Sequence, residues 1–175
     1  QYDMYKAMRD SGCYQVTIAC ESGVQRVLDK IVNKRLPVET IYPAIANAQR
    51  AGLLVHTFWI LGFPGETYEE MQQTVKFALN SGSDSFSFAI LQPLAGTPLY
   101  RKVWKEKLWW EGREKYNNFR NSLIKVDGFD GPEKFEQWVH ELNISSNLIL
   151  KKNDPEKFKW KYGENATDFD LMRQT

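Results

Sequence analysis

The sequence has few of the residues that build metal sites and disulfide frameworks. It contains two cysteines and two histidines among 175 residues. Two thiolates do not complete a usual zinc or iron–sulfur site, and a secreted domain stapled by disulfides normally carries more cysteines. We therefore expect Cys13 and Cys20 to be free thiols, no metal to be held by this chain, and a cytoplasmic location.

An excess of charge of one sign and a long apolar run are also missing. Lys and Arg number 23 against 22 Asp and Glu, a formal net charge of +1. Nucleic-acid binding usually leaves a strongly basic footprint, and a membrane span needs about 18–20 apolar residues in a row. The longest apolar stretch, residues 53–63, is interrupted by His56, Thr57 and Gly62. We expect neither nucleic acid nor a membrane span.

The first residues lack both a signal-peptide pattern and an initiator methionine. Because the sequence starts within a predicted helix, we expect an excised piece of a longer protein. A Gly-x-Ser-x-Gly elbow, a Walker loop and a His-Glu-x-x-His pair are all absent. His56 and His140 are not at ligand spacing, and His56 is interpreted as a core histidine. Catalytic residues are therefore left unassigned.

What the sequence does contain is a repeated order of helix, glycine, strand and turn. The repeat glycines are Gly12, Gly52 and Gly82. Periodicity predicts helices over 2–11, 24–32, 37–51 and 67–79, and strands over 14–20, 53–61 and 85–91. Thr67 and Glu70 have the spacing of a capping box. Strands alternating with helices predict an α/β fold with a parallel sheet, whose missing strands we expect in an absent N-terminal half.

The character of the sequence changes after Tyr100. Five of the six tryptophans lie beyond position 100, among Lys and Glu residues. Helices are predicted near 99–107 and 132–150, whereas 153–175 is expected to be loosely structured or to need a partner surface. We divide the chain into a barrel part, residues 1–105, and a helical, Trp-rich extension, residues 106–175. The tryptophans are interpreted as packing onto the barrel, with stacking on substrate as the alternative.

Three predicted turns, residues 21–23, 62–66 and 92–97, follow the three strands. In parallel α/β barrels ligands bind at the carboxyl ends of strands, so these turns share one rim. Glu21 and Glu66 both stand near glycine, which lets a backbone approach a ligand closely. Each carboxylate can accept hydrogen bonds from ribose hydroxyls or an ammonium group. The alternative is that each stabilises the following helix through its dipole.

These segments resemble the radical S-adenosylmethionine (SAM) family. Residues 18–28, with Glu-Ser-Gly, are similar to the fourth strand of the family barrel and its turn. Residues 55–66 resemble the fifth strand with its Gly-Phe-Pro-Gly-Glu signature, and residues 91–100 resemble the end of the sixth. The likeness covers about residues 1–105. It points to the branch with cobalamin-binding members and proteins similar to the anaerobic magnesium-protoporphyrin ester cyclase.

The resemblance implies a partial (β/α)6 barrel of which this chain supplies strands 4 to 6. Family barrels hold a [4Fe–4S] cluster on a Cys-x3-Cys-x2-Cys loop, and the cluster reduces SAM to a 5′-deoxyadenosyl radical that abstracts hydrogen from substrate. Cys13 and Cys20 do not match that loop. The implied protein is therefore an oxidoreductase or transferase whose cluster lies in the missing half, with this chain inactive alone. Cobalamin is a further implied cofactor of the parent protein.

Carried over by position, the resemblance implies a set of SAM-contacting residues. Glu21 and Ser22 would approach the ribose or amino-acid end of SAM, and Ile60 and Gly62 would lie beside the adenine. The turn would be shaped by residues 64–66, with residues 91 and 92 also near the adenine. The full set is Glu21, Ser22, Gly23, Ile60, Gly62, Pro64, Gly65, Glu66, Leu91 and Gln92.

Two other functions stay open. The chain could be a non-catalytic scaffold whose extension docks a partner. It could also be a barrel enzyme of phosphate or sugar metabolism, with Gly62-x-x-Gly65 before a helix as its phosphate loop. The substrate, a small molecule or a lipid-like compound, is not identified by the sequence.

Overall fold

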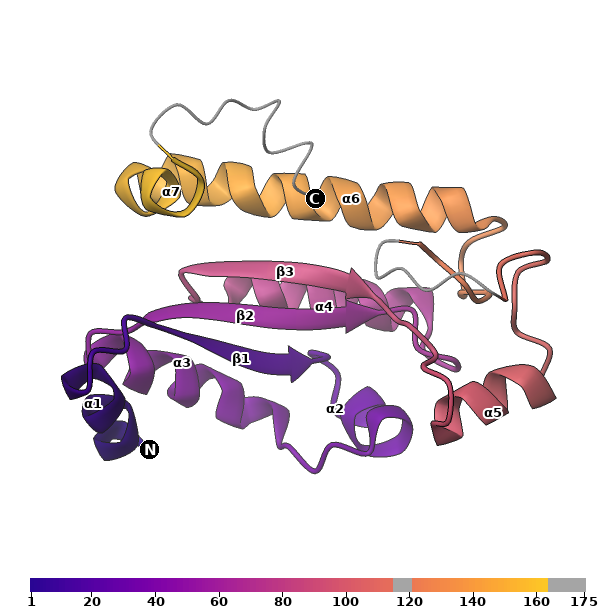
Figure 1. Cartoon of the computed structure of the whole chain (residues 1–175), viewed down its shortest axis with the longest axis horizontal. Coiled ribbons are helices and arrows are strands. Elements are labelled where there is room, and N and C mark those ends of the chain that lie inside the picture. Colours follow the sequence, from indigo (N-terminus) through magenta and orange to yellow (C-terminus); the bar gives the residue numbers. More distant parts are fainter. Residues whose placement is uncertain (115–120, 164–175) are drawn as a thin grey trace.

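The computed structural model describes residues 1–114 and 121–163. Its centre is a parallel sheet of β1 (Gln15–Glu21), β2 (Leu54–Leu61) and β3 (Ser85–Ile90), in that order. Figure 1 shows the three strands side by side, all pointing the same way. The α/β fold is confirmed, and each strand lies within one residue of its predicted bounds. Closure into a barrel would need further strands and stays a prediction.

Most helices lie where the periodicity predicts them. They are α1 (Tyr2–Asp10), α3 (Ile41–Arg50), α4 (Tyr68–Asn80), α5 (Pro98–Lys105) and α6 (Pro132–Asn153), with a short 3-10 turn η2 (Val38–Thr40) before α3. Residues 24–32, predicted as one helix, instead form α2 (Gln25–Val27) continued by a π-helix, η1 (Leu28–Val32). Asn33 ends it in a left-handed conformation with φ 55°, which asparagine tolerates better than most residues.

The segment expected to be loosely structured is in part helical. Residues Pro155–Tyr162 form α7. Proline at the first position of a helix is a start signal, because its missing N–H has no partner there in any case. The polar composition of the segment obscured that signal. Residues 164–175 lie outside the described part of the chain.

One face of the sheet is covered by helices. β2 alternates strictly between half-buried and buried residues. The buried set, which includes Val55 and Trp59, packs with Ile41 and Ile45 of α3 and Met71 of α4 in one apolar core. Each such side chain contributes about 1.5–3 kcal/mol through burial. Because side chains alternate along a strand, the half-buried set lies on the opposite face.

The predicted capping box starts α4. Thr67 Oγ1 accepts from the N–H of Glu70 at 3.3 Å, and the Glu70 carboxylate accepts from the N–H of Thr67 at 2.9 Å. Arg26 of α2 donates to the same carboxylate, with Nε 2.6 Å from Oε1. Arg26 Nη2 also donates to the C=O of Gly65 at 2.8 Å. These contacts bring the segment after β1 against the turn after β2.

α6 closes the outer edge of β3. Asn143 Oδ1 accepts from the N–H of Phe88 at 2.9 Å, and Asn143 Nδ2 donates to the C=O of Phe88 at 2.9 Å. Ser146 Oγ donates to the C=O of Phe86 at 2.9 Å. These side chains bond to backbone groups that a further strand would otherwise pair, so this edge of the sheet does not expose a row of unpaired groups to another chain. Figure 1 shows α6 running along β3.

Aromatic contacts join the extension to the rest of the chain. The ring of Trp138 in α6 lies 5.7 Å from that of Tyr68 and 5.5 Å from that of Phe129. Trp109 is buried, whereas Trp104 is 49% exposed. Packing therefore accounts for Trp109 and Trp138, and the half-exposed ring of Trp104 packs on that of Trp109 at 5.5 Å. The domain boundary between residues 105 and 106 stays a prediction.

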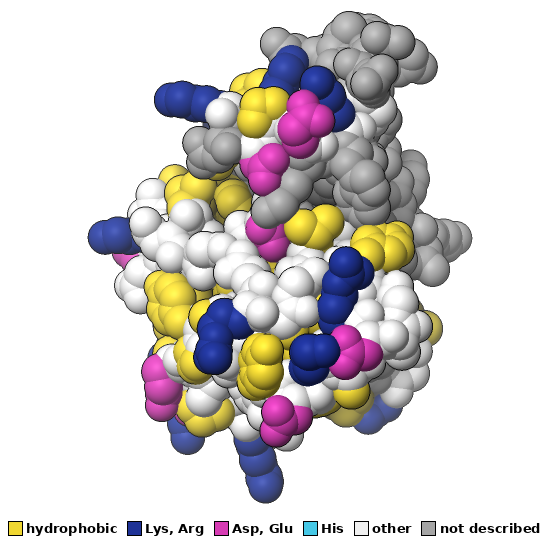
Figure 2. Space-filling model, turned by 90° about the vertical axis from the view of Figure 1, so that its left-hand side faces the viewer, with side chains coloured by type: hydrophobic (Ala, Val, Ile, Leu, Met, Phe, Trp, Pro, Cys, Tyr) yellow, Lys and Arg dark blue, Asp and Glu magenta, His cyan; other side chains and the backbone are white. Residues whose placement is uncertain are grey.

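The surface at the starting end of the strands carries charges of both signs. Figure 2 shows Lys and Arg side chains interspersed with acidic and apolar ones on this face. Among residues 1–114 and 121–163, no helix is long and apolar enough to cross a membrane.

Candidate functional site

The first strand-end turn begins with a bulge in β1. The pairing with β2 shifts between Ala19 and Glu21, which leaves Cys20 as an extra residue. Glu21 has φ 69°, a left-handed conformation that costs a non-glycine residue about 1–2 kcal/mol. Bulges and strained residues of this kind concentrate at functional sites.

Lys34 holds the end of β1 and its carboxylate. Its ammonium donates to the C=O of Ala19, and Nζ lies 3.4 Å from Glu21 Oε1. The second oxygen, Glu21 Oε2, is buried and has no hydrogen-bond partner among the described residues. Oε1 of this carboxylate is thus held by Lys34, while Oε2 accepts no hydrogen bond from the described residues.

Ser22 and Gly23 are held by α4. Ser22 Oγ lies 3.0 Å from Oγ1 of Thr74 and accepts from the N–H of Val24 at 3.1 Å. The N–H of Gly23 donates to Thr74 Oγ1 at 3.1 Å. A Cβ on Gly23 would stand 2.6 Å from Cβ of Phe77, so glycine is required here for close packing. The expected contacts of Ser22 and Gly23 with SAM stay predictions.

Glu66 folds back onto the second turn. Its Oε2 accepts from the N–H of Gly62 at 2.9 Å and from the N–H of Phe63 at 3.1 Å. The side chain is 2% exposed, and burial raises the pKa of this carboxyl to about 7, although the two backbone bonds act in the opposite direction. Near neutral pH the group is therefore poised between its charged and neutral forms.

The position of Glu66 bears on two alternatives. Thr67 caps α4, so Glu66 caps the strand-end turn and not the helix. The N–H groups of Gly62 and Phe63 are already taken by this carboxylate. The turn therefore does not offer them to a phosphate, which argues against the phosphate-loop alternative.

The two glycines of the second turn differ in their surroundings. Gly62 has φ 88°, and a Cβ there would meet the ring of Phe135 at 3.0 Å and Val126 at 3.1 Å. Gly65 has φ 90°, but a Cβ there would meet nothing within 4 Å. Pro64 between them is buried. The extension thus fills the space beside Gly62, whereas Gly65 faces open space.

Gln92, after β3, is turned toward the extension. Its Nε2 donates to the C=O of Asn121 at 2.9 Å, while its Oε1 is buried without a partner among the described residues. Leu91 and Ile60 meet in a second apolar cluster. The buried members of that cluster are Val27, Phe63, Leu91, Val103, Trp109, Leu123 and Ile124. The structure therefore brings Ile60 and Leu91 together, and residues of the extension share their surroundings.

The ends of the three strands have one feature in common. Each carries a buried oxygen acceptor with no donor among the described residues: Glu21 Oε2 after β1, Glu66 Oε1 after β2 and Gln92 Oε1 after β3. Such atoms are rare, because an unpaired buried polar group costs about 1–3 kcal/mol. Each of these oxygens could accept a hydrogen bond from a hydroxyl, amino or ammonium donor of a ligand.

The sequence did not indicate the residues that hold these turns in place. Thr74 lies 52 residues after Ser22 along the chain, and Lys34 lies 13 residues after Glu21. One signal was present, because Thr74 is a polar residue on the otherwise apolar side of the predicted helix 67–79. The sequence did not indicate the role of Lys34, because this residue stands in a charged stretch typical of a solvent-exposed loop.

The donor set of the described residues does not fit an iron–sulfur cluster. They include no group of three or more His, Cys, Asp or Glu side chains placed to hold a metal ion. Cys20 is fully buried, which raises the pKa of its thiol to about 12, whereas a cluster needs thiolates. Cys13 Sγ donates to the C=O of Gln15 at 3.2 Å.

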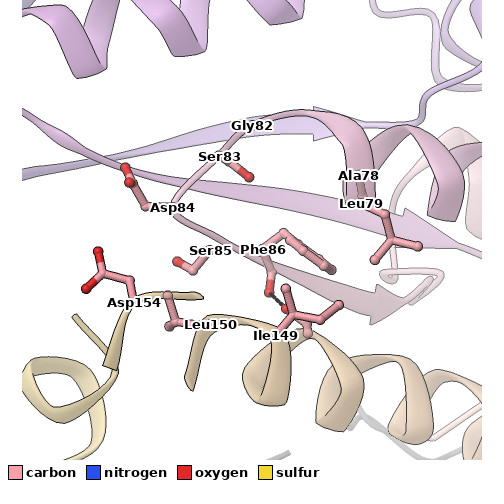
Figure 3. A pocket seen from close by; sticks show the side chains of 11 residues that line it. Ala78, Leu79, Gly82, Ser83, Asp84, Ser85, Phe86, Ile149, Leu150 and Asp154 are labelled. Carbon is pink, nitrogen blue, oxygen red and sulfur yellow. Dashed lines mark hydrogen bonds between the residues drawn. The ribbon is translucent and has the colours of Figure 1, made fainter. Parts of the chain in front are cut away.

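A cavity of about 260 Å³ lies at the opposite end of the sheet. Figure 3 shows its walls, which come from the start of β3, the end of α4 and the last turns of α6. Asp84 on one wall accepts from the N–H of Val55, with Oδ2 2.7 Å from the nitrogen. None of the predicted SAM residues lines this cavity. Those residues lie at the other end of the strands, where parallel α/β folds usually bind their cofactors.

The chain is thus an α/β protein with a candidate ligand site at the carboxyl ends of three parallel strands. Residues 2–78 match the sequence model of the Radical SAM superfamily. The match includes β1, β2 and the first two strand-end turns. The resemblance predicted from the motifs is therefore confirmed for residues 2–78.

Similar curated proteins are enzymes of more than one kind. Cytidylyl-2-hydroxyethylphosphonate methyltransferase of Streptomyces wedmorensis is 36% identical over 152 residues, which make up 83% of this chain and 28% of the relative. An uncharacterised methyltransferase of Pyrococcus horikoshii is 38% identical over 95 residues, 54% of this chain and 20% of that protein. Anaerobic magnesium-protoporphyrin IX monomethyl ester cyclase of Rubrivivax gelatinosus is 28% identical over 129 residues, 74% of this chain and 23% of the relative.

The chain thus spans between 20% and 28% of the length of these relatives. A match over 83% of the chain reaches beyond residue 105. The likeness therefore includes part of the extension, where the motifs gave no resemblance.

Proposed function

We propose that this chain supplies part of the SAM pocket of a radical SAM enzyme. The observation that carries the proposal is the set of buried acceptors at the strand ends, Glu21 Oε2, Glu66 Oε1 and Gln92 Oε1. SAM offers complementary donors in its ammonium, its ribose hydroxyls and its adenine amino group. The superfamily match of residues 2–78 supports the same ligand.

The three residues have different roles in this proposal. Glu21 accepts from a ribose hydroxyl or the ammonium of SAM through Oε2, while Lys34 holds Oε1. Gln92 is oriented by its bond to Asn121 and offers Oε1. Glu66 fixes the backbone of the Gly62 turn through Oε2 and offers Oε1 to the ligand. When bound beside a reduced iron–sulfur cluster, SAM supplies the radical chemistry of the family.

The cluster itself belongs elsewhere in the protein. The described cysteines do not form a ligand set, so we assign its binding to residues outside this chain and expect no catalysis from the chain alone. Two of the similar proteins are named methyltransferases, which favours methyl transfer as the reaction class. Cobalamin and the substrate stay predictions.

One observation favours the scaffold alternative. Ser22 is committed to Thr74, and the Cβ positions of Gly23 and Gly62 are filled by Phe77 and by Phe135 with Val126. Packing explains these residues without a ligand. The two functions therefore differ in what they require of Glu21 and Gln92, not of the glycines.

Titration calorimetry of the intact protein with S-adenosylhomocysteine discriminates between the two functions. Glu21→Gln and Gln92→Leu are each expected to weaken binding about tenfold, as expected for losing one hydrogen bond to a ligand donor. Glu69→Gln, an exposed carboxylate on α4, is the matched control and should bind as the wild type does. Equal affinity for all four proteins, or no binding by any of them, would favour the scaffold.

A further inference from the structure

The face of the sheet opposite the apolar core is lined but not filled by the described residues. His56, Phe58 and Ile60 of β2 point to it, and all three are half-buried. Phe58 belongs to neither apolar cluster. In Figure 1 α4 lies behind the sheet, α6 runs beside β3, and no helix crosses the near face. A ligand on this face would meet side chains from all three strands.

Strand register brings polar side chains into one row across this face. Thr17 of β1 pairs with His56 of β2, and His56 pairs with Ser85 of β3. Neighbouring strands lie about 4.8 Å apart, so these three side chains are adjacent. Ser87 points the same way two residues further along β3 and pairs with Phe58. The row therefore has hydroxyl groups on both sides of an imidazole.

The imidazole of His56 is bound at both nitrogens. Nδ1 lies 2.8 Å from Ser85 Oγ, and Nε2 lies 2.9 Å from Ser87 Oγ. A neutral ring has one N–H and one bare nitrogen, so one serine accepts from it and the other donates to it. A doubly protonated ring donates to both serines. Both hydroxyl protons then become available to a further acceptor.

The strand residues on this face include no acidic side chain. They are Gln15, Thr17 and Ala19 of β1, Leu54, His56, Phe58 and Ile60 of β2, and Ser85, Ser87 and Ala89 of β3. Carboxylates do lie near Ser85: Asp84 before β3 and Asp154 after α6 line the same cavity as Ser85. A further carboxylate, Glu21, ends β1. Glu21 is paired with Lys34, and Asp84 accepts from the N–H of Val55.

We propose that Thr17, His56, Ser85 and Ser87 form a subsite for an oxyanion of the substrate. Three hydroxyl donors surround a ring that can take up a proton, and together they complement a phosphate, phosphonate or carboxylate group. The subsite deepens the proposed function, because the substrate of that enzyme would occupy this face. It rests on contacts separate from the strand-end acceptors.

The subsite lies well away from the strand ends. His56 precedes Ile60 by four residues, about 13 Å along an extended strand. An oxyanion held there is remote from the predicted SAM contacts, so it anchors the far end of the substrate. The subsite therefore acts on substrate affinity and leaves the SAM pocket untouched.

Imidazole signals of the intact protein provide the test. Proton–carbon NMR of the Cε1 positions reports on His56 and on His140 in α6, and each signal is assigned by its loss in His56→Gln or His140→Gln. The intact protein is titrated with inorganic phosphate, methylphosphonate and acetate separately, and chloride at matched ionic strength is the control. The His56 signal should move saturably toward its protonated position with at least one oxyanion, while His140 stays fixed.

Variants separate this subsite from the SAM pocket. Ser85→Ala with Ser87→Ala is expected to weaken oxyanion binding about tenfold, and Thr17→Val by a smaller factor. His56→Gln should abolish binding, because glutamine cannot take up the proton. Affinity for S-adenosylhomocysteine should be unchanged in all of them. No saturable shift of the His56 signal, equal shifts of both histidines, or undiminished binding by the serine double variant would overturn the proposal.

Discussion

The turns after β1 and β2 contain the same kinds of residue in a different order. Each has a carboxylate, a glycine and a helix that follows. Glu66 comes after Gly62, so its side chain can fold back onto N–H groups three and four residues earlier. Glu21 comes before Gly23, at the end of the strand, and its side chain reaches Lys34 instead. The order of the residues, and not their kind, therefore decides which carboxylate accepts hydrogen bonds from the backbone of its own turn.

The difference extends to what holds each turn. In the second turn, Glu66 accepts from N–H groups of the turn itself. The first turn is held by side chains from elsewhere: Thr74 of α4 accepts from the N–H of Gly23, and Lys34, after η1, donates to the end of β1. Glu21 is therefore freer to serve a ligand, and Glu66 is more bound to the fold. Substitutions at three positions, Gly62, Glu66 and Glu21, test this distinction.

The largest effect is expected at Gly62. Gly62→Val introduces a branched side chain at a left-handed φ and drives it against Phe135 and Val126, at a cost of about 3–5 kcal/mol of unfolding free energy. Gly65→Val is the matched control, because it has the same φ with open space around it, and should cost about 1–2 kcal/mol. Urea unfolding with an unchanged m-value measures both. Equal losses would show that the extension does not pack on this turn.

The next effect concerns the pH dependence contributed by Glu66. Burial raises the pKa of this carboxyl from its ordinary 4.5 to about 7 in the folded protein. Its contribution to stability is therefore complete below pH 4.5 and is lost as the pH rises through 7, by up to about 3 kcal/mol. Glu66→Gln keeps an acceptor for the turn and carries no charge, so its unfolding free energy should fall less between pH 5 and 8.

The control for this prediction is Glu69→Gln, which removes an exposed carboxylate three residues away. Its unfolding free energy should follow the wild-type pH dependence. Equal slopes for the wild type and Glu66→Gln would show that Glu66 stays ionised in the folded protein.

Local features of these turns were predictable, and their long-range supports were not. The strands, the Thr67–Glu70 capping box and the placement of Glu21, Glu66 and Gln92 at one rim follow from periodicity and from short spacings. The bonds of Thr74 to residues 22 and 23 span more than 50 residues, so no window of sequence contains both partners.

The geometry inside a short segment also escaped prediction. The apolar spacing of residues 24–32 did not distinguish the five-residue π-helix η1 from a continuing α-helix. The sequence indicated only that Asn143 lies in a helix, yet its side-chain amide forms two hydrogen bonds with the backbone of Phe88. Polar side chains that replace a missing strand have no local pattern, because their partner is set by how α6 docks.

The smallest effect is expected at Glu21, where two substitutions separate strain from charge. Both Glu21→Gln and Glu21→Gly remove the ion pair with Lys34, which is partly exposed and contributes about 0–1 kcal/mol. Only glycine also relieves the left-handed conformation, so Glu21→Gly should be more stable than Glu21→Gln by about 1 kcal/mol. Thermal or urea unfolding of the pair measures this difference, and equal stabilities would show that the bulge holds no strain. A more stable glycine variant that binds S-adenosylhomocysteine less tightly would mean that the fold gains nothing from a glutamate here, so the carboxylate is kept for its ligand.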